Sequence, residues 1–426
     1  MKLNNYVQIN EQVYSAVLPN GLYVYVVPKP GFHKKYAFFA TEYGGVDRRF
    51  KLADKWIDTP AGVAHFLEHK LFDTEDGNAL ELLSANGASP NAYTSNDVTA
   101  YHFESIDKFS ENLETLLGFV SVPYFTPESV EKEQGIIEQE IRMVEDDPDY
   151  CLYYGFLKSL FKSNPVRDSV AGTVESIKEI TAETLYDCHK VFYAPSNMAL
   201  CVVGDVDPST VYEIAQKRLP EERGEVPERC YGQSEILSPE TTGINKTMEV
   251  SLPIFLAGCK ITPAKRGKDS FWQDIVGALA LEILCGHSSP LYVRLYTEGL
   301  INVDFSASFD SAAGVAYTMF GGEARDPHRV YEEVQNEVRR LSKQGPDAAF
   351  FRRIKKAAIG SHIRALNSFG MIASSIVEGH FRGFDPFEAP ALLTKVTVDD
   401  VVNFLSENMI TGNMAISTIN PKGNVK

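Results

Sequence analysis

Two similar segments lie 216 residues apart in this chain (397 − 181 = 216), and this internal similarity constrains the fold more than any other feature. Ile180-Thr181-Ala-Glu-Thr-Leu185 and Val396-Thr397-Val-Asp-Asp-Val401 both have the pattern of a helix start, with Thr as the N-cap and acids in the first turn. Each Thr is followed 16 residues later by Asn-Met and then by an apolar, strand-like run. A period of about half the chain indicates duplicated domains rather than a solenoid of short repeats.

The predicted boundary between the halves lies within residues 219–246, which are rich in Pro, Gly and Glu and show little apolar periodicity. We therefore expect two homologous domains, residues 1–225 and residues 226–426. Both halves mix strands and helices without strict βαβ alternation, which predicts the α+β class, with antiparallel-type mixed sheets covered on one face by helices. The expected strands are 21–27, 36–40, a pair within 89–103, 254–261 and others within 302–322; the expected helices are 61–72, 76–86, 129–145 and 271–284.

The composition is that of an ordinary globular protein. Of the 426 residues, 44% are hydrophobic and 23% are charged, which argues against a disordered chain, a collagen-like fibre and a small disulfide scaffold. The net charge of −16 argues against nucleic acid or an anionic membrane surface as a partner. Six widely spaced cysteines without a Cys-x-x-Cys pair indicate reduced thiols. With no apolar signal-like segment at the N-terminus and no long apolar run, we expect a cytoplasmic protein that does not span a membrane.

The segment Gly62-Val-Ala-His65-Phe-Leu-Glu68-His69-Lys70 contains His-x-x-Glu-His. On a helix, His65 and His69 lie one turn apart on the same face, and Glu68 is adjacent to them. Two imidazoles at this spacing suit zinc, and a neighbouring carboxylate can act as a general base. Two surface histidines can also share a helix face by chance. The apolar residues around this motif favour metal binding, because a buried Glu beside two buried His is costly unless they are paired.

A catalytic zinc usually takes three protein ligands, so a third is needed. In the predicted helix 129–145, Glu133 and Glu140 are two turns apart and share a face, while Ile136, Ile137 and Ile141 mark the apolar side. Taken alone, the pattern of this helix favours a solvated, charge-rich surface. Its combination with the histidine motif makes it the candidate source of the third ligand.

Together these motifs resemble the pitrilysin/insulinase family of zinc metallopeptidases, the inverzincins, and in particular their small two-domain bacterial members. In that family, His-x-x-Glu-His is followed about 70 to 80 residues later by Glu-x6-Glu, and here His65 and Glu140 are 75 residues apart (140 − 65 = 75). Asn20-Gly-Leu22 at the start of the first expected strand, Asn91-Ala-Tyr-Thr94 after the second helix, and Glu68-His-Lys-Leu-Phe72 also match. The resemblance covers essentially the whole chain and implies a metalloprotease/processing-peptidase-like fold.

The resemblance also implies roles for individual residues. It implies one Zn²⁺ per chain, with His65, His69 and Glu140 as the ligands. It implies Glu68 as the general base and Glu133 as a carboxylate that orients a ligand histidine or the water of the site. An edge strand that pairs with an extended peptide substrate is implied at Asn91, Ala92 and Tyr93. Pairing of this kind recognises the backbone of the peptide more than its side chains, which suits short or unfolded peptides.

The second half departs from the family pattern. The family binds the substrate carbonyl with an Arg and a Tyr seven residues apart. In an alignment with one gap, Tyr296 and Asn302 stand in those places here, with Arg294 two residues early. The helix of the second half that corresponds to the histidine helix, within residues 278–285, also lacks His-x-x-Glu-His. We therefore expect a zinc-bearing peptidase subunit that forms a heterodimer with a homologous chain lacking the motif, although a homodimer remains possible. The alternatives are a non-catalytic assembly or scaffold member and a dedicated peptide-maturation factor.

Overall fold

The computed structural model describes residues 1–409 and 413–423, and the chain divides into two compact units. Unit 1 comprises Met1–Ile141, Ser169–Tyr231 and Ile363–Phe387, and unit 2 comprises the remaining segments, Arg142–Asp168, Gly232–His362 and Glu388–Lys426. Most of unit 1 therefore comes before Gly232 and most of unit 2 comes after Tyr231. Each unit also includes one segment from the other part of the chain. The predicted duplicated domains, 1–225 and 226–426, are inferred from internal sequence similarity, which the spatial units do not test. That division stays a prediction.

Unit 1 is built on a seven-stranded sheet in the order β1-β2-β3-β11-β4-β10-β9. Its strands are β1 (Lys2–Tyr6), β2 (Glu11–Val17), β3 (Tyr23–Pro28), β4 (Lys35–Thr41), β9 (Ser89–Thr94), β10 (Thr99–Ser105) and β11 (Met198–Gly204), with small hairpins β5 (Arg49–Leu52)–β6 (Lys55–Asp58) and β7 (Asp73–Thr74)–β8 (Gly77–Asn78). Its helices are α1 (Val63–Leu71), α2 (Ala79–Ala85), α3 (Phe109–Ser121), α6 (Val174–Lys178), α7 (Ala182–Phe192), α8 (Pro208–Arg218), α13 (Phe369–Arg382) and most of α4 (Pro127–Glu145).

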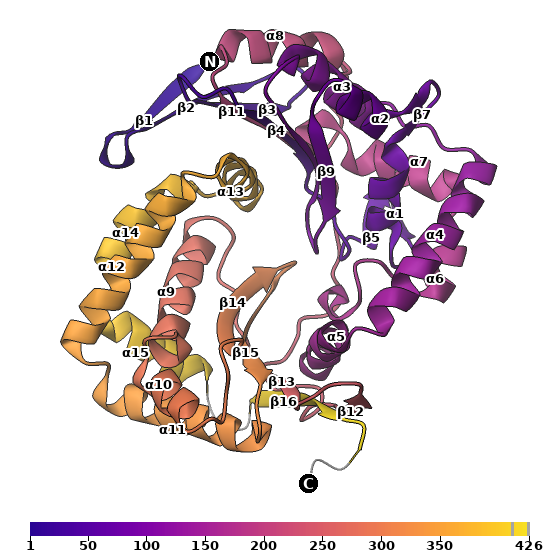
Figure 1. Ribbon diagram of the computed structural model, residues 1–426. Coiled ribbons are helices and arrows are strands. Elements are labelled where there is room, and N and C mark those ends of the chain that lie inside the picture. Colours follow the sequence, from indigo (N-terminus) through magenta and orange to yellow (C-terminus); the bar gives the residue numbers. More distant parts are fainter. Residues whose placement is uncertain (410–412, 424–426) are drawn as a thin grey trace. The chain divides into compact units, whose positions relative to one another are not determined.

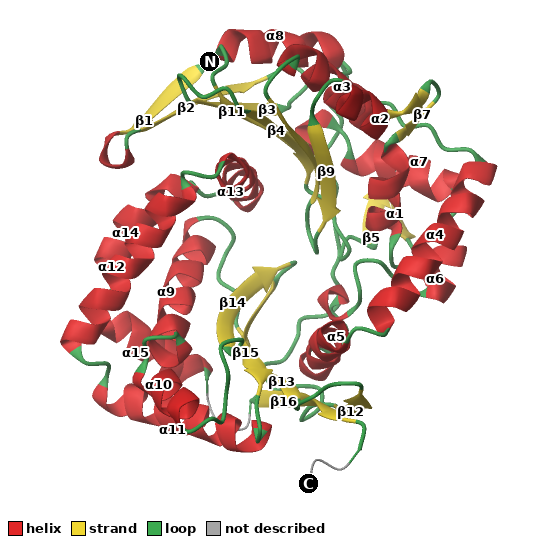
Figure 2. Cartoon of the chain, viewed as in Figure 1, coloured by secondary structure: helices red, strands yellow, loops and turns green. Residues whose placement is uncertain are grey.

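Unit 2 is built on a five-stranded sheet in the order β12-β16-β13-β15-β14. Its strands are β12 (Asn245–Met248), β13 (Ile254–Ile261), β14 (Ser306–Ala312), β15 (Val315–Glu323) and β16 (Met414–Pro421). Its helices are α5 (Pro148–Leu160), α9 (Lys268–Cys285), α10 (Pro290–Thr297), α11 (Pro327–Gln344), α14 (Ala389–Lys395), α15 (Val398–Asn408) and most of α12 (Ala348–Ala365). The α+β prediction, with sheets covered by helices, is confirmed (Figure 2).

The two sheets share one topology, and the repeated sequence pattern lies at the same place in both. Thr181 and Thr397 each cap a helix by accepting a hydrogen bond from a backbone N–H three residues on, as the sequence indicated. The strand that follows is β11 in unit 1 and β16 in unit 2. β11 lies between β3 (parallel) and β4 (antiparallel), and β16 lies between β12 (parallel) and β13 (antiparallel). The order β3-β11-β4-β10-β9 therefore corresponds to β12-β16-β13-β15-β14, strand for strand.

Both faces of the unit 1 sheet are buried, which differs from the expectation of one covered face. Along β4, Ala37 and Phe39 enter the core cluster that includes α1, α3 and α7, whereas Phe38 and Ala40 enter a second cluster under α13. This alternation is the two-residue period of a strand. Both sets are apolar because helices pack on both sides, as Figure 1 shows for α3 and α8 on one side of the sheet and α13 on the other.

Unit 2 has an equivalent arrangement. Its sheet packs against α9, α11 and α15, and also against α5 through a small apolar cluster of Leu152, Ile254 and Ile419. Since α5 comes from the first half of the chain and α13 from the second, the exchange of helices is reciprocal. Lys268–Thr297 is long and apolar enough to meet a simple criterion for a membrane span, but 72% of its most apolar window is buried within the protein, as in a core helix.

Candidate metal centre

Helix α1 carries the histidine motif and is held at both ends. It begins after Gly62, whose φ of 100° is left-handed and whose absent Cβ would lie 2.7 Å from the carbonyl oxygen of Ala171. Near its other end, the buried Lys70 ammonium donates to Asp73 Oδ2 at 2.5 Å. Asp73 Oδ1 in turn accepts from the side chain of Asn78, which caps α2. These contacts fix the position of α1 in unit 1. Sequence reasoning gave Lys70 no role, because a lysine is normally read as a surface residue.

Helix α4 presents two of its glutamates, Glu133 and Glu140, to α1. Its buried residues include Ile137 and Ile141, at the helical spacing of one apolar face. The prediction that Ile136 belongs to this face is wrong, since that side chain is 47% exposed. Glu133 and Glu140 lie on the side that meets the histidines, so the predicted pairing of the two helices is realised (Figure 1).

Three side chains that could hold a metal ion, His65, His69 and Glu140, converge between these helices. His65 Nε2 lies 3.5 Å from Glu140 Oε1, and His69 Nε2 lies 3.7 Å from Glu140 Oε2. The ligand atoms of all three residues lie within 4.8 Å of one another, and no other such group of His, Cys, Asp or Glu occurs among residues 1–409 and 413–423. All three side chains are only partly buried, so the group is reachable from solvent.

This geometry and donor set fit a zinc ion. Tetrahedral zinc with ligands at about 2.0–2.2 Å keeps its ligand atoms about 3.3–3.6 Å apart, close to the separations of 3.5 and 3.7 Å between the histidine nitrogens and the Glu140 oxygens. These separations are longer than an ordinary hydrogen bond between imidazole and carboxylate. Two imidazoles and one carboxylate are also a common ligand set of catalytic zinc.

Glu133 lies behind one of the histidines rather than in the ligand group. Its Oε1 is 3.0 Å from His69 Nδ1, so the carboxylate fixes the ring and leaves Nε2 directed at Glu140. Burial lowers the pKa of His69, but the hydrogen bond to Glu133 and the charges of Glu133, Glu68 and Glu140 outweigh it and raise the pKa overall. For Glu140, the interaction with the nearby His65 ring is the largest cause of a lowered pKa, which favours the ionised carboxylate.

His65 has no such support. Its Nδ1 is buried and has no hydrogen-bond partner among the described residues. The two histidines are therefore held unequally, and Glu133 gives the site its main orienting contact.

Glu68 is directed toward the edge of the sheet. Its Oε2 accepts a hydrogen bond of 2.6 Å from Thr94 Oγ1 on β9, the outermost strand beside β10. The predicted substrate residues precede Thr94 on this strand. Ala92 packs on the face of α1, whereas Tyr93 packs on the face under α13, and Asn91 Oδ1 accepts from the backbone N–H of Ala92. Sequence reasoning included Thr94 in a matching motif but gave it no role, because only the strand register reveals its contact.

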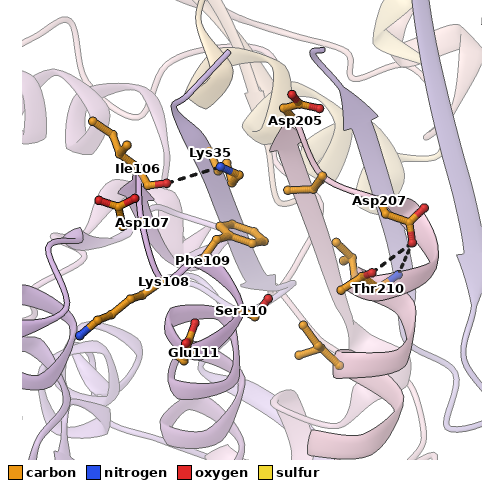
Figure 3. A pocket seen from close by; sticks show the side chains of 13 residues that line it. Lys35, Ile106, Asp107, Lys108, Phe109, Ser110, Glu111, Asp205, Asp207 and Thr210 are labelled. Atoms are coloured by element: carbon orange, nitrogen blue, oxygen red, sulfur yellow. Dashed lines mark hydrogen bonds between the residues drawn. The ribbon is translucent and has the colours of Figure 1, made fainter. Parts of the chain in front are cut away.

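A separate cavity of about 470 Å³ in unit 1 does not belong to this centre. Figure 3 shows it beside the starts of α3 and α8, with polar side chains that already serve the local structure. Asp207 caps α8 through the N–H and hydroxyl of Thr210, Asp205 accepts from the backbone of Gly31, and Lys35 donates to the carbonyl of Ile106. None of the predicted site residues lines this cavity.

We expect Glu133→Gln to weaken zinc binding about 10- to 100-fold, because loss of a carboxylate partner makes the ligand histidine less basic and less well oriented. Competition with a chromogenic zinc chelator measures the affinity. Glu131→Gln, on the same helix but exposed, is the control and should bind zinc as the parent chain does. An unchanged affinity in Glu133→Gln would contradict the orienting role.

Comparisons with known proteins agree with this centre. Residues 57–174 match the model of insulinase (peptidase family M16), and residues 179–358 match that of the peptidase M16 inactive domain. The chain is 39% identical to the uncharacterized zinc protease YmfH of Bacillus subtilis, over 98% of both chains. It is also 23% identical to the uncharacterized zinc protease YmxG of the same organism, over 85% of this chain and 89% of that protein.

Solved structures extend the match to the fold. A crystal structure of an M16-like peptidase from Alicyclobacillus acidocaldarius superposes with a TM-score of 0.93 at 34% identity, covering 97% of this chain and 99% of that one. A protease from Helicobacter pylori shares the fold with a TM-score of 0.81 at 19% identity, covering 96% of this chain and 100% of that one. The domain matches, the full-length similarity and the shared fold together show that the chain belongs to the insulinase family, peptidase family M16.

Proposed function

We propose that the chain is the zinc-bearing subunit of a metalloendopeptidase that hydrolyses short or unfolded peptides. The observation that carries this proposal is the convergence of His65, His69 and Glu140, with the carboxylate of Glu68 on the same helix. A scaffold protein has no need of this constellation. Three ligands also leave a fourth position for the reacting groups, as in catalytic zinc sites.

Each residue of the candidate metal centre has a separate role in the proposed reaction. His65, His69 and Glu140 would hold a zinc ion, which would supply a Lewis acid for the activation of water and of a peptide carbonyl. Glu68, with Oε2 held by Thr94, has Oε1 to take the proton of the attacking water and to pass it to the leaving amine. Glu133 keeps His69 in the orientation that binding requires.

The edge strand β9 supports a substrate of extended peptide. It pairs with β10 on one side only, so within the described residues its other edge is open to an added strand. A peptide paired along Asn91, Ala92 and Tyr93 would be held by its backbone close to the residue that contacts Glu68. This mode selects against folded proteins, whose strands are already paired, and tolerates many side chains.

The proposed partner is a homologous chain without His-x-x-Glu-His. In unit 2, Arg294 is already paired with Glu333 at 2.7 Å, and Asn302 donates to Glu323 at 2.5 Å. Tyr296, which stands where the family has an Arg, carries no positive charge. A second subunit that brings a free Arg and a Tyr would supply the donors that stabilise the developing oxyanion, each worth about 2.7–4 kcal/mol in comparable sites.

We expect little or no peptide cleavage by the purified, zinc-loaded chain and robust cleavage once the partner is added. A fluorogenic peptide assay with and without the partner, together with sedimentation analysis of the mixture, tests this. Strong activity of the isolated chain that the partner does not change would instead indicate a self-sufficient homodimer. A zinc-loaded complex that cleaves no unfolded peptide would favour the scaffold or the dedicated maturation factor.

A further inference from the structure

We propose that Thr94 is a positioning residue that sets the orientation of the Glu68 carboxylate and links it to the peptide-binding edge of the sheet. The proposal rests on the proposed function, because it concerns how the general base is held. Its direct evidence is the hydrogen bond from Thr94 Oγ1 to Glu68 Oε2 at 2.6 Å. This length is in the range of a strong hydrogen bond from a hydroxyl to an ionised carboxylate.

The hydroxyl of Thr94 is itself fixed by the strand. Thr94 is the last residue of β9 and stands opposite Thr99 of β10. The Thr99 hydroxyl donates to the carbonyl oxygen of Tyr43 at 2.8 Å and lies 3.4 Å from Thr94 Oγ1. A β-branched side chain in a strand has few χ1 choices, so the backbone of β9 determines where the donor points.

The hydrogen bond from Thr94 makes the two carboxylate oxygens of Glu68 inequivalent. Oε2 is occupied by Thr94, while Oε1 receives no hydrogen bond from any side chain or backbone group in the described part of the chain. Rotation of the carboxylate would break a hydrogen bond to a charged group, so Oε1 stays available for the proton of the attacking water. No similar donor reaches Glu68 from α4, whose Glu133 and Glu140 face the histidines.

The same contact connects substrate binding to catalysis. β9 is an edge strand, and an added peptide strand would hydrogen-bond along it within three residues of Thr94. Pairing with a peptide would restrain the backbone of β9. Because the Thr94 hydroxyl is attached to that backbone, the orientation of the Glu68 carboxylate would be restrained as well. Binding energy from parts of a peptide distant from the scissile bond would then appear in kcat rather than in KM.

The test compares Thr94→Val, which keeps the shape and removes the hydroxyl, with Thr94→Ser, which keeps the hydroxyl. Both are assayed as zinc-loaded full chains in the assembly that cleaves peptides. Thr94→Val should lower kcat at least ~10-fold, a part of the ~10²–10⁴-fold contribution of the general base, with KM and zinc content little changed. Thr94→Ser should recover most of kcat. Thr74→Val, in the exposed β7–β8 hairpin after α1, is the matched control.

Two results would overturn the proposal. One is normal kcat in Thr94→Val, and the other is an equal loss of kcat in the Ser and Val variants, which would indicate packing rather than the hydroxyl. Crystal structures give a readout that does not depend on activity. Glu68 should leave its position against β9 in Thr94→Val and keep it in Thr94→Ser, and an unmoved carboxylate in Thr94→Val would also contradict the proposal. If the carboxylate moves as expected but no assembly cleaves peptides, the proposed function fails while the positioning contact stands.

Discussion

Replacing Glu68 by Gln should slow peptide cleavage at least ~100-fold while zinc stays bound, because a general base typically contributes 10²–10⁴-fold. Gln has nearly the same size and can still accept a hydrogen bond from Thr94, so the shape of the site is kept. Its amide cannot take a proton from water. The measurement is steady-state cleavage of a fluorogenic peptide by the zinc-loaded variant in the active assembly, with the metal content determined on the same sample.

The matched control for this experiment is Glu81→Gln, an exposed carboxylate in the first turn of α2. It changes the net charge equally and should leave turnover unchanged. Near-normal turnover by zinc-loaded Glu68→Gln would contradict the assignment of the base. Loss of zinc from that variant would show instead that Glu68 is a ligand or is needed for the fold.

Substitution of a metal ligand should have the second large effect. His65→Ala removes one imidazole, and Glu140→Gln replaces a charged donor with a weaker, neutral one. With two strong ligands left, each variant should lose most of its zinc on dialysis and most of its activity with it. Elemental analysis gives the zinc content per chain, with circular dichroism to show that the fold is retained.

An exposed histidine of the same unit provides the comparison. His33→Ala should keep one zinc per chain, because His33 lies outside the ligand group. Full zinc occupancy in both His65→Ala and Glu140→Gln would refute the ligand assignment. Full occupancy in only one of them would point to a different third ligand, such as Glu133, whose carboxylate contacts His69.

The candidate site was predictable from the sequence where its geometry is local. His65, Glu68 and His69 share one helix, so the helical repeat alone places them together. The meeting of that helix with Glu140 depends on tertiary packing across 75 residues. The two motifs together made helix 129–145 a candidate source of the third ligand, but only the resemblance to a family chose Glu140 rather than Glu133. The contact of Thr94 with Glu68 depends on the register of β9 against β10, which no periodicity in the sequence reveals.

The fold, too, was predictable from the sequence only where it depends on local structure. Thr181 and Thr397 cap helices as expected, and the strands that follow them occupy equivalent places in the two sheets. The exchange of α5 and α13 was not foreseen. The amphipathic pattern of a helix such as α13 shows that one side will be buried, but it does not identify the sheet that buries it. The continuous apolar run along β4 was the available signal that both faces of that sheet are covered.

The place of α13 in the chain has a consequence for synthesis on the ribosome. Phe387 is made 387 − 231 = 156 residues after Tyr231, the last residue of the preceding segment of unit 1. At ~5–20 residues per second, this delay lasts roughly 8–30 s. During that time the nascent sheet has its first layer of helices, but Phe38, Ala40 and Val203 lack the helix that later covers them. The emerging chain therefore exposes an apolar sheet face to which chaperones can bind, and unit 1 can complete its folding only after its last segment, which ends at Phe387, has been made.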